Sequence, residues 1–258
     1  MKEQQRRIPI GSPEAIAIYN QHALPLAINS GDGVMPWDKK NWATFSLVRL
    51  PERDVCITCN HVYERLLEVQ RNDPAARIVA YPPGGDFPLV ELNTFELIDR
   101  EGPSLDVAVF GGLEPRISLP NRRFIDYRNT YIPDPVLGES VMISGYPSSG
   151  LDASENRMVF GHTFICFRAS SITERQIILA NEHGDRTFEH SDDPTRTGTD
   201  LGGMSGSPAF MVRDGKLGFV GIVTDCSGSS DNTDGTIIIS RLGCLNPDGT
   251  LDHHAIAW

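Results

Sequence analysis

The chain has 258 residues, of which 40% are hydrophobic and 22% are charged, and its formal net charge at pH 7 is −11. This composition is that of a globular protein with one large domain or two small ones. Nucleic acids and anionic membranes reward a basic surface, so we expect neither as a partner. No part of the sequence approaches the roughly 20 consecutive apolar residues that span a bilayer.

The N-terminal stretch MKEQQRRIPIGSPEAIAIYN lacks the apolar core of a secretory signal. Within it, Ser12 and Pro13 before AIAIYNQHAL predict a short, capped amphipathic helix. The following INSGDGVMPWDKKNW predicts a loop, so we interpret residues 1–40 as an N-terminal extension with a short helix. The cysteines are scattered and odd in number, which favours buried thiols in a reducing compartment and a cytoplasmic protein. They are Cys56, Cys59, Cys166, Cys226 and Cys244.

From residue 41 onward, short apolar or alternating runs are separated by turns. The runs ATFSLVRL, DVCITCN and DVAVFGG predict strands, and HVYERLLEVQRN predicts a helix between two of them. Residues 113–138 are rich in proline and lose this periodicity, so we interpret them as a crossover between an N-terminal barrel, residues 41–112, and a C-terminal barrel, residues 139–258. About six short strands in each half predict an all-β protein built from two antiparallel barrels.

The stretch LGGMSGSPAF, residues 201–210, predicts a tight turn around Ser205. Gly203 and Gly206 permit backbone angles that a Cβ would block. The stretch resembles the nucleophile loop of the chymotrypsin-like (trypsin-fold) serine peptidases, whose pattern is Gly-x-Ser-Gly-Gly/Ser-Pro. This resemblance implies that Ser205 is a nucleophile and that the N–H groups of Gly203 and Ser205 form an oxyanion hole.

Two further motifs resemble the same family. TCNHV, residues 58–62, is similar to its Thr-Ala-Ala-His pattern and would make His61 the general base. SLDVAVF is similar to its Asp-x-Ala-x-φ strand start and would make Asp106 the acid that orients His61. The order His, Asp, Ser is the family's order, and VMISGYP looks like the first strand of the second barrel in bacterial relatives. The resemblance covers roughly residues 43–242 and implies two six-stranded barrels, an active site in the cleft between them, a protein or peptide substrate and no cofactor.

Two stretches also suggest metal chemistry. CITCNH, residues 56–61, has the cysteine spacing of a zinc or thiol redox site. Because DVCITCN alternates like a strand, Cys56 and Cys59 should point to opposite faces, which favours two apolar fillers. EHGDRTFEHSDD, residues 182–193, mixes histidines and acids without a metal-ligand spacing, so we interpret it as an exposed charged loop. We therefore predict no metal.

Other positions depart from the family or bear on specificity. Position 204 is Met where digestive members have an aspartate that pairs with a newly cut N-terminus, so we do not expect activation by that route. Regulation by loop ordering, by the N-terminal extension or by a protein partner is the alternative. TRTGTD before the loop and VTDCSG at residues 223–228 align with the substrate pocket and the strand beside it. The candidate substrate-binding residues are Thr199, Asp200, Thr224, Asp225 and Cys226.

These observations leave three hypotheses. The first is a cytosolic serine endopeptidase that uses His61, Asp106 and Ser205, and the presence of all three motifs in order favours it. The second is a catalytically inactive trypsin-fold module that binds peptides or partners. The third is a metal or redox protein that uses Cys56 and Cys59.

Overall fold

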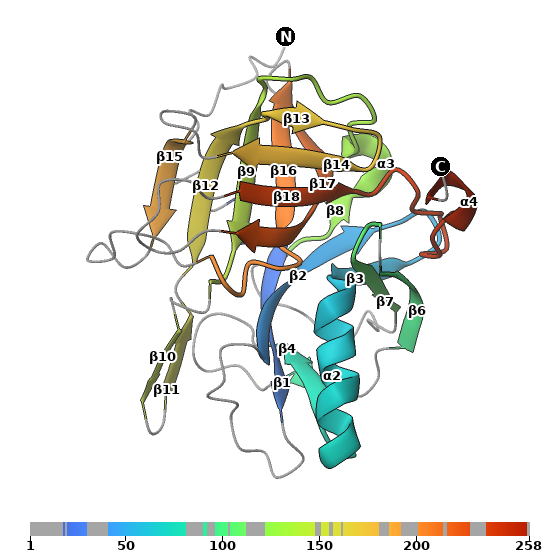
Figure 1. Ribbon diagram of the computed structural model, residues 1–258, viewed down its shortest axis with the longest axis vertical. Helices are drawn as coiled ribbons and strands as arrows, with labels where there is room; N and C mark the ends of the chain where they lie inside the picture. Colours follow the sequence, from blue (N-terminus) through green and yellow to red (C-terminus); the bar gives the residue numbers. More distant parts are fainter. Residues whose placement is uncertain are drawn as a thin grey trace, which may run out of the picture.

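Most regular structure in the protein is β-strand, arranged in two curled sheets that lie one above the other in Figure 1. The computed structural model describes residues 18, 20–29, 41–80, 90–91, 96–102, 104–111, 122–147, 151–154, 157–160, 162–180, 186–191, 201–213, 216–227 and 236–256. The named helices are α2 (Asn60–Asn72), which packs against the first sheet, and the single-turn helices α3 (Tyr127–Thr130) and α4 (His253–Ile256). Among the described residues, no helix has the length and apolar character needed to cross a membrane.

The first sheet has the strand order β5-β4-β1-β2-β3-β7-β6, and β8 pairs with β2 in parallel. The other pairs are antiparallel. The strands are β1 (Ala23–Asn29), β2 (Trp42–Arg49), β3 (Asp54–Thr58), β4 (Arg77–Ala80), β5 (Val90–Glu91), β6 (Glu96–Glu101), β7 (Val107–Gly111) and β8 (Ile125–Asp126).

The second sheet has the strand order β13-β14-β18-β17-β16-β9-β12-β15, with antiparallel pairs throughout. Strands β10 and β11 form a separate hairpin. The strands of this half are β9 (Ser140–Gly145), β10 (Leu151–Ser154), β11 (Arg157–Phe160), β12 (Thr163–Arg168), β13 (Ser171–Ile172), β14 (Gln176–Ala180), β15 (Arg186–Ser191), β16 (Pro208–Arg213), β17 (Lys216–Ser227) and β18 (Thr236–Arg241).

Both sheets curl back on themselves. In the first sheet, β5 and β6 stand at opposite ends of the strand order, yet Glu91 and Glu96 are close in the chain and lie at most about 18 Å apart. In the second sheet, β12 contacts β14 as well as its own neighbours. The predicted all-β fold with two curled antiparallel sheets is therefore confirmed. The count of six strands per barrel is not confirmed, because each sheet has eight strands in the described part of the chain.

In the described part of the chain, the buried hydrophobic side chains form three clusters, one within each sheet and one that joins the two sheets. A single cluster of buried side chains takes Val55 and Val107 from the first sheet together with Phe164, Phe210 and Phe219 from the second. The predicted helix after β3 is confirmed as α2, and it buries Val62 and Leu66 against the first sheet. Loops that leave the facing edges of the two sheets are therefore held at fixed positions relative to each other.

The interpretation of residues 1–40 as an extension outside the barrel is wrong for residues 23–29. Residues 23–29 form β1, which pairs with β2 on one side and β4 on the other. Every residue of this strand is buried, so ALPLAIN lacks the polar–apolar alternation that marks a half-exposed strand. Its first two residues, Ala23 and Leu24, close the run AIAIYNQHAL that predicts the short amphipathic helix, so they are strand and not helix. Residues 1–17 and 19 lie outside the described residues.

The C-terminal segment returns to the first sheet instead of completing the second. Leu245, Leu251 and Ile256 belong to the core cluster that joins the two sheets. On β6, Asp99 accepts hydrogen bonds from the N–H of Leu251 at 2.9 Å and from the His253 side chain at 3.1 Å. The range 139–258 is thus not a self-contained C-terminal barrel.

This contact predicts a pH-dependent contribution to stability. Burial acts to raise the pKa of Asp99, but the N–H groups of Leu251 and Arg100 and the His253 side chain together hold it below its ordinary value. Asp99→Asn should therefore lower the free energy of unfolding at pH 7 by about 1–2 kcal/mol. Because the folded pKa is depressed, this stabilisation is complete above the unfolded pKa of about 3.9 and is lost as the pH falls through the folded value.

Urea unfolding of wild type and Asp99→Asn at neutral and strongly acidic pH measures both effects. Asp134, whose side chain is 81% exposed, provides the matched control, and Asp134→Asn should change stability by less than about 0.5 kcal/mol. An Asp99→Asn difference that stays constant between the two pH values would contradict the assignment.

Candidate active site

His61 is placed by the junction between β3 and α2. The strand ends at Thr58, and Cys59 occupies the N-cap position without a capping side-chain hydrogen bond. The Asp106 side chain supplies the missing acceptor, because its Oδ1 accepts a hydrogen bond from the N–H of His61 at 2.8 Å. A carboxylate at a helix N-terminus is favoured by the exposed N–H groups and the helix dipole.

The imidazole of His61 is held by the same carboxylate. Its Nδ1 lies 2.6 Å from Asp106 Oδ2, and the two side chains are 51% and 28% exposed. An ionised carboxylate only accepts hydrogen bonds, so Nδ1 carries the proton and Nε2 is left as the acceptor. The pair therefore presents a basic nitrogen from a half-exposed ring whose orientation is fixed.

Asp106 is held in a strained backbone conformation. Its φ is +53°, and it is the only described residue other than glycine with a positive φ. Its N–H donates to Gly102 O, its own carbonyl accepts from the N–H of Asn60, and the adjacent carbonyl of Leu105 accepts from Ser240 Oγ on β18. Strain of this kind persists where the surroundings over-determine it, often at functional sites.

The loop that carries Ser205 comes from the second sheet and docks on the first. The N–H of Thr44 on β2 donates to Ser205 O at 2.9 Å, and the N–H of Gly206 donates to Val223 O on β17 at 2.7 Å. Gly203 and Gly206 have φ values of +89° and +88°. The two glycines thus occupy the left-handed conformations that the tight turn requires.

The N–H groups of this loop fall into two sets. Those of Met204, Gly206 and Ser207 donate to backbone carbonyls. Those of Gly203 and Ser205, the predicted oxyanion-hole donors, form no hydrogen bond to any described residue. These two N–H groups of one turn therefore have no acceptor among the described residues. An oxyanion hole requires two such donors that can bind a substrate oxygen.

The Ser205 side chain lies beside Cys59, next to the His61–Asp106 pair. Burial raises the pKa of the Cys59 thiol well above its ordinary value, and Asp106 and Cys226 raise it further, whereas hydrogen bonds from the Ser205 side chain and the Gly206 backbone lower it. Cys59 Sγ also donates to Val223 O at 3.2 Å. Within the described residues, Ser205 Oγ and His61 Nε2 form no direct hydrogen bond, a contact that often tightens only when substrate binds.

The predicted substrate-binding residues divide into two groups. Thr199 and Asp200 lie outside the described residues. Thr224, Asp225 and Cys226 lie on β17, where Thr224 is buried at a bulge, Asp225 is exposed and Cys226 is partly buried. Burial and the nearby Asp225 raise the pKa of the Cys226 thiol to about 12.

Ser240, which supports the backbone next to Asp106, was not predicted from the sequence. Thr224 Oγ1 lies 3.2 Å from Ser240 Oγ, and Ser240 in turn donates to Leu105 O, the carbonyl next to Asp106. The second sheet therefore supports the strained backbone of the first. TIIISRL predicts only a strand, and no local motif distinguishes Ser240 from any other strand serine.

The two cysteines of CITCNH belong to the same hydrophobic cluster, and the strand alternation behind the prediction of opposite faces does not reach Cys59. β3 ends at Thr58, which puts Cys59 in the turn into α2, where strand alternation no longer applies. Both thiols are free and buried, and burial raises the pKa of Cys56 well above its ordinary value. Cys56 does not join Cys59 in a described cluster of metal-ligating side chains.

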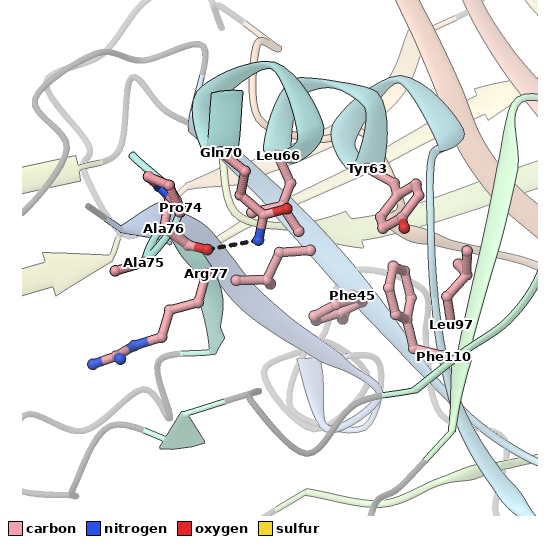
Figure 2. A pocket seen from close by; sticks show the side chains of 11 residues that line it. Phe45, Tyr63, Leu66, Gln70, Pro74, Ala75, Ala76, Arg77, Leu97 and Phe110 are labelled. Atoms are coloured by element: carbon pink, nitrogen blue, oxygen red, sulfur yellow. Dashed lines mark hydrogen bonds between the residues drawn. The ribbon is translucent and has the colours of Figure 1, made fainter. Parts of the chain in front are cut away.

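A cavity of about 520 Å³ lies between α2 and the first sheet (Figure 2). Aromatic and aliphatic side chains form most of its wall, and Gln70 crosses one side of it to donate to Ala76 O at 2.8 Å. The lining residues are Phe45, Tyr63, Leu66, Gln70, Pro74, Ala75, Ala76, Arg77, Ile78, Leu97 and Phe110. None of the three predicted catalytic residues lines it.

Comparison of the chain with known protein-family models and with curated proteins gives no match.

Proposed function

We propose that the protein is a serine endopeptidase of the chymotrypsin-like (trypsin-fold) type. The observation that carries the proposal is the convergence of two loops from different sheets. One presents the hydrogen-bonded pair of His61 and Asp106. The other presents Ser205 in a glycine turn with two N–H groups that have no described acceptor.

In the proposed reaction, Ser205 Oγ attacks the carbonyl carbon of the scissile peptide bond while His61 Nε2 takes the hydroxyl proton. Asp106 holds the ring in the required tautomer and stabilises the imidazolium that forms. The N–H groups of Gly203 and Ser205 bind the oxyanion of the tetrahedral intermediate. His61 then donates its proton to the leaving amine, and water hydrolyses the resulting acyl-enzyme by the same steps.

We propose a peptide segment of a protein as substrate, bound as an added strand beside β17 near Thr224, Asp225 and Cys226, with Thr199 and Asp200 at the pocket wall. The reaction needs no cofactor. All five thiols are free, which fits work in a reducing compartment such as the cytoplasm, and regulation through a protein partner is part of this proposal.

The alternative is a trypsin-fold module that binds peptides without cleaving them. The observation that favours it is the lack of a direct hydrogen bond between Ser205 Oγ and His61 Nε2 in the described structure. In this case the two free N–H groups and β17 would bind a peptide carbonyl and backbone, and Ser205 would have no activated hydroxyl.

A fluorophosphonate probe separates the two functions because it reacts covalently only with an activated serine. We expect stoichiometric labelling of wild type, a mass increase on the peptide that contains Ser205, and loss of labelling in Ser205→Ala. Ser207→Ala is the matched control, because its hydroxyl is two residues away and fully buried, and this variant should still react. Folded wild-type protein that resists the probe would favour the binding module.

A further inference from the structure

The Cys59 thiol extends the His61–Asp106 pair into a cluster of three side chains that ligate metals. Cys59 Sγ, a ring nitrogen of His61 and a carboxylate oxygen of Asp106 all lie within 4.8 Å of one another. Cys59 is fully buried at the base of the cluster, whereas the His61 and Asp106 side chains are partly exposed. Solvent ions therefore have an entry path to two of the three ligands.

We propose that this cluster is a binding site for a thiophilic divalent cation, with Zn²⁺ as the probe. Thiolate, imidazole and carboxylate are the three ligand types that protein zinc sites use, and three protein ligands plus one water form a common tetrahedral site. The ion would lie between the Cys59 thiolate, His61 Nδ1 and an Asp106 oxygen. Binding releases the thiol proton to solvent and moves the imidazole proton from Nδ1 to Nε2, so that the ring binds the ion as a neutral ligand.

The geometry requires small movements that the exposed residues can make. Zinc bonds of about 2.0–2.3 Å place two ligands of one ion roughly 3–4 Å apart. His61 Nδ1 and Asp106 Oδ2, now 2.6 Å apart, must therefore separate, and Cys59 Sγ must approach them. Cys59 gives up its contact with Val223 O, and the half-exposed imidazole rotates while the backbone of Asp106 stays in place.

The consequence for the proposed peptidase is reversible inhibition. Zn²⁺ would replace the hydrogen bond between Asp106 and His61 Nδ1, and Nε2 would then carry the ring proton, so it could not take the proton of Ser205. The metal site itself does not depend on peptidase activity, whereas inhibition rests on the proposed function. Free zinc or a related cation would thus lower peptidase activity by binding His61 and Asp106, the residues proposed to activate Ser205.

Calorimetric titration of the full chain with Zn²⁺ tests the site without any activity measurement. We expect one tight site in wild type and an affinity at least about tenfold weaker in Cys59→Ala. Cys56→Ala is the matched control, because Cys56 is an equally buried free thiol of the same hydrophobic cluster that lies outside the ligand group. Its zinc affinity should stay within about twofold of wild type.

Two further measurements make the result specific. Co²⁺ in place of Zn²⁺ should give a thiolate-to-metal charge-transfer band in wild type and Cys56→Ala, and no such band in Cys59→Ala. Should Cys59→Ala fail to fold, His61→Ala removes a half-exposed ligand and should also weaken binding. Zinc affinity that is unchanged by Cys59→Ala or His61→Ala, or the absence of a one-to-one site in wild type, overturns the proposal.

The same samples distinguish a wrong metal site from a wrong enzyme assignment. Zinc should slow fluorophosphonate labelling of wild type and Cys56→Ala, when each rate is compared with that variant's own zinc-free rate. Zinc binding through Cys59 in a protein that the probe never labels would retain the metal site and remove the peptidase proposal. Probe labelling that zinc does not slow, together with weak zinc binding, would retain the peptidase proposal and remove the metal site.

Discussion

Replacing Asp106 with asparagine should lower kcat for peptide hydrolysis by about 10⁴-fold with little change in KM. The asparagine amide presents an N–H₂ group or a neutral oxygen to His61 Nδ1, so the ring is no longer held with its proton on Nδ1. Ser205 then faces a nitrogen that cannot take its proton. The same change removes the negative charge that stabilises the imidazolium in the transition state.

Asparagine is the informative substitution because it retains the other functions of Asp106. It tolerates the left-handed conformation found at φ +53°, and its carbonyl oxygen can still accept the N–H of His61. The fold and the start of α2 should therefore remain. The measurement is kcat and KM on a peptide selected by cleavage profiling, with circular dichroism to confirm folding.

A second aspartate provides the control for this experiment. Asp54 pairs with Arg49 on the surface of the first sheet at 2.8 Å, so Asp54→Asn should leave kcat unchanged. If Asp106→Asn reduced kcat by less than about tenfold, Asp106 would be a structural cap of α2 and not the orienting acid of a triad.

Replacing Gly206 with alanine should destabilise the protein by at least about 3 kcal/mol and prevent labelling of Ser205. Its φ is +88°, which already penalises any side chain, and an added Cβ would lie 2.0 Å from Thr44 O and 2.5 Å from Thr58 Oγ1. Both atoms belong to the first sheet. The nucleophile loop would have to move away from His61 to relieve the overlap.

Gly138 separates the backbone effect from the steric effect. Its φ is +80°, and an added Cβ there would meet nothing within 4 Å. Gly138→Ala should therefore cost only the left-handed backbone energy, roughly 1–2 kcal/mol, and leave labelling intact. Urea unfolding curves measure the loss in free energy of unfolding in each variant. Equal losses in Gly206→Ala and Gly138→Ala would show that contact with Thr44 does not restrict the side chain at position 206.

The sequence suggested the candidate catalytic residues through the resemblance of three motifs to those of the chymotrypsin-like serine peptidases, and two of these motifs have local backbone features that the structure contains. The turn around Ser205 needs glycine at Gly203 and Gly206, and both indeed have positive φ. An apolar strand that leads directly into a helix places His61 at a helix start. Such features involve neighbours in the chain, so spacing and residue type are enough to suggest them.

Other features depend on pairing between distant segments, which no local pattern encodes. β1 is a strand because β2 and β4 satisfy its backbone groups on both sides, although its first two residues belong to the run that predicts a helix. The C-terminal segment packs on the first sheet through Asp99 and Leu251, and Ser240 supports Asp106 from the second sheet. In each case the deciding partner lies far away in the sequence.

Cys59 shows most clearly which features the local sequence predicts and which depend on tertiary packing. Its sequence context suggests a zinc or redox partner at Cys56, three residues away, and strand alternation argues against that pair. By itself the sequence determined which residue types are present and which local turns they permit. Only the tertiary structure decided that the thiol lies beside Ser205, His61 and Asp106. Burial of the apolar faces brings the ends of the two sheets together, and this packing selects neighbours by surface complementarity and not by distance along the chain.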